Sequence, residues 1–64
     1  MDFAEGDRVV YRPQLDSPET SFGKIIKVIN FPNEKPRYVI VDEITNDNNE
    51  FYLDRILQTD NRSY

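Results

Sequence analysis

The chain contains no cysteine, no histidine and no tryptophan among its 64 residues. Without cysteine it can form neither a disulfide framework nor a cysteine-based zinc site, the two staples of many small domains. It also lacks a side chain that titrates near neutral pH when unperturbed, and a thiolate nucleophile. Paired carboxylates would need a deep cleft, which so short a chain does not easily enclose. We therefore expect a non-enzymatic protein that needs no cofactor.

Long apolar runs are lacking as well. None approaches the roughly 20 residues that span a bilayer, and no signal-peptide apolar region follows Met1. The composition, 38% hydrophobic and 31% charged, is that of a globular protein. Eight basic and twelve acidic residues give a formal net charge of −4. We expect one intracellular domain, monomeric and not bound to membranes, with a small core.

What remains is a β pattern, and no stretch has helical apolar periodicity. The expected strands lie within residues 3–11, 22–29, 37–44 and 50–54, and the first of them follows a turn at Gly6-Asp7. A 3₁₀ turn and a short fifth strand are expected over residues 54–57. Proline at position 13 ends the first strand because it donates no ladder hydrogen bond. Gly23 permits close backbone approach or a sharp bend at the start of the second strand. Adjacent apolar pairs later in that strand predict a β-bulge near Ile26-Lys27, which would put Ile25 and Val28 on one face.

A flat sheet of so few short strands would leave open edges and one wet apolar face, so we expect the sheet to curl. The sequence predicts an all-β fold, a small SH3-like (Tudor-like) barrel of four to five antiparallel strands in meander order. This barrel is expected over residues 1–57, and residues 58–64 are expected to be a flexible C-terminal tail.

The strand and turn motifs resemble those of a known family. They are Gly6-Asp7-x-Val9-x-Tyr11-Arg12-Pro13, Gly23-Lys24-Ile25, Pro36-Arg37-Tyr38 and the turn at Thr45. Together they resemble the small Tudor-like domains called hypervirulence-associated proteins and, more broadly, Tudor and KOW-type barrels, over residues 3–57. One departure is the third turn, where the family reads Thr-Gly-Lys and this chain has Asn46-Asp47 after the threonine. The resemblance implies an SH3-like fold without catalytic residues, and Tudor domains at large imply binding of methylated lysine or arginine in an aromatic cage.

Meander geometry places the loop after the first strand and the turn after the third strand at the same end of the barrel. A cage for a methylammonium group needs aromatic faces within about 6 Å of the cation, with an acid nearby. Residues that flank these two connections could supply both. The candidate ligand-binding residues are Tyr11, Phe22, Asp42, Glu43 and Tyr52.

A packing role for the aromatic rings is the alternative. In that case Tyr11 is only a plug at the barrel end with its hydroxyl in water, and Phe22 is a lid on the core. Phe51 alternates with Leu53, so both are expected to point inward. The pairs Asp42-Glu43 and Asp47-x-x-Glu50 lack the Asp-x-Asp spacing of a calcium loop. We expect these acids to be solvated at a turn and to bind no metal.

The acid excess favours a basic partner, a peptide or protein segment rich in lysine or arginine, methylated or not. Nucleic acid is the alternative partner, since KOW-type barrels bind it. Lys24 and Lys27 lie on one strand, but their odd spacing puts them on opposite faces of the sheet unless the bulge brings them to the same face. A pI of about 4.5 disfavours phosphate binding, and such lysines also serve to blunt edge strands.

Overall fold

The computed structural model describes residues 3–59, so the part of the expected tail at 60–64 lies outside the described residues. The elements are β1 (Arg8–Tyr11), β2 (Ser21–Ile29), β3 (Arg37–Asp42), β4 (Asn48–Tyr52), a 3₁₀ turn η1 (Leu53–Arg55) and β5 (Ile56–Thr59). All strand pairs are antiparallel. The predicted all-β fold, including the 3₁₀ turn and the short fifth strand, is confirmed.

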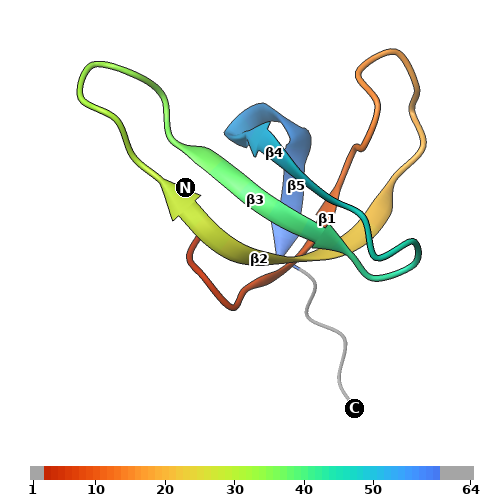
Figure 1. The fold of residues 1–64 in the computed structure, drawn as a ribbon. Coiled ribbons are helices and arrows are strands. Elements are labelled where there is room, and N and C mark those ends of the chain that lie inside the picture. The colour runs from red at the N-terminus through yellow and green to blue at the C-terminus, as the bar shows by residue number, and fades with distance from the viewer. Residues whose placement is uncertain (1–2, 60–64) are drawn as a thin grey trace.

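The strands form one curled sheet in the order β4-β3-β2-β1-β5 (Figure 1). The first four strands follow one another as a meander, and β5 returns to the free edge of β1. Because β4 and β5 do not pair, the sheet is an open SH3-like barrel rather than a closed one. Gln58 and Thr59 pair with Val10 and Val9, so the sheet extends two residues beyond the boundary expected at residue 57. No helix within residues 3–59 is long and apolar enough to cross a membrane.

The predicted bulge lies in the middle of β2. Ile25 pairs with Ile40 and Lys27 with Val39, so Ile26 is the extra residue. Its side chain is 48% exposed, whereas Ile25 is fully buried and Val28 packs against the core. The bulge thus reconciles the adjacent apolar pairs of β2 with a single buried face.

The turn after β3 is tighter than expected. Asn46 adopts a left-handed φ of 64°, which asparagine tolerates better than most residues. As a result β3 ends at Asp42, and β4 starts at Asn48 rather than at residue 50. Phe51 faces the core as predicted, but Leu53 does not, because it leaves β4 for the 3₁₀ turn and is 37% exposed.

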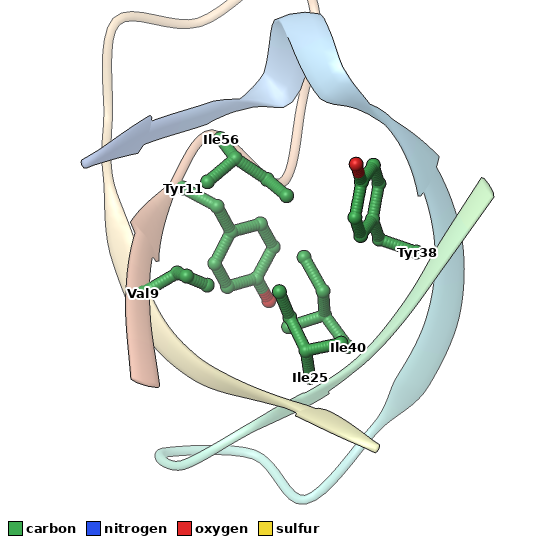
Figure 2. Packing of buried hydrophobic residues seen from close by; sticks show 6 residues of the cluster. All are labelled: Val9, Tyr11, Ile25, Tyr38, Ile40 and Ile56. Carbon is green, nitrogen blue, oxygen red and sulfur yellow. The ribbon is translucent and has the colours of Figure 1, made fainter. Parts of the chain in front are cut away.

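Six buried side chains form the core enclosed by the curled sheet (Figure 2). They are Val9, Tyr11, Ile25, Tyr38, Ile40 and Ile56. Gly23 allows β2 and β3 to approach closely here, since a Cβ atom at this position would collide with the Cγ2 of Ile40. Close approach, the first of the two roles expected for this glycine, is therefore the one the fold uses.

Candidate functional site

A hollow of about 360 Å³ opens at the end of the sheet where the β1–β2 loop meets the β3–β4 turn. These two connections come together as the meander geometry predicts. The lining residues are Tyr11, Pro13, Gln14, Glu19, Thr20, Ser21, Asp42, Ile44, Thr45, Asp47, Asn49 and Phe51. This set includes three carboxylates and no lysine or arginine, so the hollow is acidic.

Asp42 holds the base of the hollow together. Its side chain is 5% exposed, and its Oδ2 accepts hydrogen bonds of 2.6 Å from the hydroxyls of Tyr11 and Ser21. Its Oδ1 accepts from the backbone N–H groups of Ile44 at 2.7 Å and Thr45 at 3.0 Å. One carboxylate thus ties β1, β2 and the β3–β4 turn together. The Tyr11 hydroxyl, which the packing alternative left in water, instead donates to this carboxylate.

The same contacts set the ionisation of both groups. Burial opposes the charged form of Asp42, but the hydrogen bonds from Ser21, Tyr11 and the two turn N–H groups outweigh it and lower its pKa to about 2. Burial, the hydrogen bond to Asp42 and the nearby carboxylates raise the pKa of Tyr11. Asp42 is therefore ionised, and Tyr11 is a neutral hydrogen-bond donor, throughout the physiological range.

Stability is expected to fall in acid because of Asp42. A carboxyl whose pKa is about 3.8 when unfolded and about 2 when folded stabilises the protein above pH 4, and this contribution is lost as the pH falls through both values. The loss amounts to about 2 kcal/mol between about pH 5 and pH 2. Urea unfolding followed by tyrosine fluorescence across this range measures it. An NMR titration in which Asp42 ionises near 3.8 would contradict it.

Phe51, Glu19 and Asp47 form the accessible part of the hollow. The Phe51 ring lies 5.1 Å from that of Tyr11, centroid to centroid, and remains partly exposed because β4 is an edge strand of the open sheet. The two carboxylates lie on exposed residues of opposite connections. None of the three is among the candidate ligand-binding residues predicted from the sequence. Glu19 and Asp47 share one signal, since each lies within one of the two connections that were expected to meet, whereas Phe51 lies further along β4 and was expected to point inward.

Three of the five predicted site residues do not line the hollow, so the structure does not bring all five together in one site. Phe22 has the opposite parity to the buried Ser21 and Gly23 and lies on the outer face of β2. The Glu43 carboxylate lies 3.5 Å from the guanidinium of Arg8.

Tyr52 is the third of these residues. It pairs with Arg37 at the far end of β4, 5.8 Å from its guanidinium. Tyr11 and Asp42 do meet at the hollow, but Tyr11 is only 3% exposed. The three-ring cage of Tyr11, Phe22 and Tyr52 is therefore not formed.

Charged side chains also fix the β1–β2 loop. The guanidinium of Arg12 donates to the carbonyls of Leu15 at 3.1 Å and Ser17 at 2.9 Å. Arg55 in turn donates to the carbonyls of Arg12 and Pro13. Asp42 holds one wall of the hollow and these arginines hold the other, so both walls are fixed by hydrogen bonds within the protein.

The bulge in β2 has a second effect, on charge. Lys24 pairs with Val41 and Lys27 with Val39, so the two lysines share the outer face, with Arg8 paired to Lys24. This basic strip lies on the other side of the sheet from the core. Within residues 3–59, no group of three or more acidic side chains is arranged to hold a metal ion.

Comparison with protein-family models, curated proteins and solved structures finds no significant match to this chain. The function therefore has to be argued from the geometry of the hollow.

Proposed function

We propose that the protein is a non-enzymatic binding module that takes a lysine or arginine side chain of a peptide or protein segment into the acidic hollow. The observation that carries the proposal is the lining of the hollow, which holds three carboxylates and no basic residue. A cation that enters would neutralise this charge, and the carboxylates of Glu19 and Asp47 are accessible for ion pairing. The apolar stem of the same side chain would lie against Phe51.

Two properties of Asp42 support binding rather than catalysis. The buried Asp42 carboxylate already accepts four hydrogen bonds within the protein, so it is not available as a general base. Its charge nevertheless adds to the negative potential below the hollow, where screening by solvent is weak. A methylated ammonium would also be accommodated, because it keeps its charge and adds apolar surface for the ring.

The test is a titration with short lysine- and arginine-containing peptides, unmodified and methylated, followed by NMR chemical shifts. We expect shifts at the residues that line the hollow and affinity that weakens with salt. The double variant Glu19→Gln/Asp47→Asn is expected to bind about tenfold more weakly, a loss of about 1.4 kcal/mol. The matched control, Glu5→Gln/Glu34→Gln, removes the same charge from exposed loop positions outside the hollow and is expected to bind within about twofold of the parent.

Nucleic acid is the competing partner, and the basic strip of Arg8, Lys24 and Lys27 is the observation that favours it. Shifts confined to this strip, and obtained with an oligonucleotide but not with basic peptides, would overturn the proposal. The acidic pI of about 4.5 and the ion pair between Arg8 and Glu43 both weigh against that outcome.

A further inference from the structure

A second hollow, of about 310 Å³, lies beside the first, and Phe51 lines both. We infer that the two hollows form one groove for an extended segment that carries a basic residue and, two positions away, an apolar one. The basic side chain occupies the first hollow and the apolar side chain the second. This inference rests on the proposed function and specifies the class of segment that the same site selects.

The second hollow differs from the first in its charge balance. It is lined by Leu15, Glu50, Phe51, Tyr52, Asp54 and Arg55. Glu50 lies 3.7 Å from the guanidinium of Arg37, and Arg55 lies over the Phe51 ring at 5.7 Å and donates to two loop carbonyls. Its lining carries two carboxylates and one guanidinium, against three carboxylates and no basic group in the first hollow, so it attracts a cation less than the first one does.

Its apolar walls, by contrast, are open. Leu15 is 67% exposed and Tyr52 is 46% exposed, and neither belongs to the core cluster. The backbone of Leu15 is held in place because its carbonyl accepts from Arg12. An exposed leucine on a fixed loop loses little freedom on binding. An apolar side chain of the ligand would cover Leu15 and Tyr52 and gain the free energy of burying both.

The spacing follows from the geometry of an extended chain. Side chains at i and i+2 point the same way and lie about 7 Å apart, whereas side chains at i and i+1 point to opposite sides. Because Phe51 lines both hollows, a ligand that passes over it can place residues i and i+2 in the two hollows. A pair of adjacent residues cannot do so.

The experiment compares three short peptides, Lys-Ser-Leu, Lys-Ser-Ser and Lys-Leu-Ser, each between flexible Gly/Ser flanks, by fluorescence anisotropy. We expect Lys-Ser-Leu to bind about fivefold to tenfold more tightly than the other two. Leu15→Ser is expected to remove most of this advantage, so that the affinities for Lys-Ser-Leu and Lys-Ser-Ser become similar. The matched control, Ile26→Ser, changes a side chain of similar size and exposure, 48%, on the bulge of β2 and is expected to keep the full advantage.

The outcomes separate this inference from the proposed function. If all three peptides bind equally, and all depend on Glu19 and Asp47, the basic-segment function stands and the groove is refuted. The groove is also refuted if the leucine advantage survives in Leu15→Ser, or if Lys-Leu-Ser binds as tightly as Lys-Ser-Leu. If no lysine peptide binds, both proposals fail together.

Discussion

We expect Asp42→Asn to lower the free energy of unfolding by about 2–4 kcal/mol. The NH₂ group of asparagine would replace one carboxylate oxygen and would face either the two hydroxyls or the two backbone N–H groups that now donate to the carboxylate. At least one oxygen acceptor is therefore lost inside the protein. A domain of this size has a total stability of about 3–10 kcal/mol. The variant is therefore expected to lose a large share of its stability and to unfold at a clearly lower urea concentration, which urea titration followed by far-UV circular dichroism measures.

Asp47→Asn is the matched control, because it removes the same charge from the same turn at an exposed position. Its effect is expected to stay within about 0.5 kcal/mol. Tyr11→Phe and Ser21→Ala each delete one of the two hydroxyl donors to Oδ2 and are expected to cost about 1–2 kcal/mol. Equal stability of Asp42→Asn and Asp47→Asn would show that the buried carboxylate does not hold the fold together.

The strands and turns could be predicted because their signals are local. Proline 13, the asparagine turn and the β-branched runs each act within a few residues, and the bulge in β2 followed from two adjacent apolar pairs. The exact start of β4 could not be predicted in this way. It depends on Asn46 entering the left-handed region, which shortens the turn, and on Leu53 leaving the strand.

The site was harder to predict than the fold, since it depends on which faces meet in space. The meander rule correctly brought two connections together, yet Tyr52 was assigned to the wrong end of β4 because flanking a turn was taken as closeness to it. Asp42 had a usable signal, since it shares its parity with the buried Tyr38 and Ile40. An aspartate at a core-facing position needs donors, and the hydroxyls on β1 and β2 supply them.

The division of labour among the acids explains why a net charge of −4 alone could not locate the site. Asp42 accepts hydrogen bonds that stabilise the fold, and Glu43 and Glu50 form ion pairs with arginines on the outer face. Among the three carboxylates that line the hollow, those of Glu19 and Asp47 belong to exposed residues. Which carboxylates face the hollow and which are engaged within the protein is thus a property of the fold rather than of the composition.

Gly23→Ala is the second substitution for which we expect a large loss of stability, about 2–3 kcal/mol, by overpacking. The new methyl group would collide with the Cγ2 of Ile40 and lie 3.0 Å from the carbonyl oxygen of Val41 and 3.1 Å from Cε1 of Tyr11. None of these atoms can retreat easily, because Ile40 and Tyr11 are buried and the carbonyl belongs to β3. The expected result is a lower urea midpoint, despite the small gain from a stiffer unfolded chain.

A double-mutant cycle with Ile40→Ala tests whether this collision is the cause. Truncating Ile40 alone creates a cavity and is expected to cost about 2–5 kcal/mol. In the double variant the two methyl groups no longer collide and the added Cβ fills part of the cavity, so the combined loss should be smaller than the sum by about 1 kcal/mol or more. If the two losses of stability simply add, Gly23 is needed for its backbone conformation and not for the space that its missing side chain leaves to Ile40. Since β2 and β3 also carry Ser21 and Asp42, the close approach that Gly23 permits keeps these two side chains within hydrogen-bond distance at the base of the hollow.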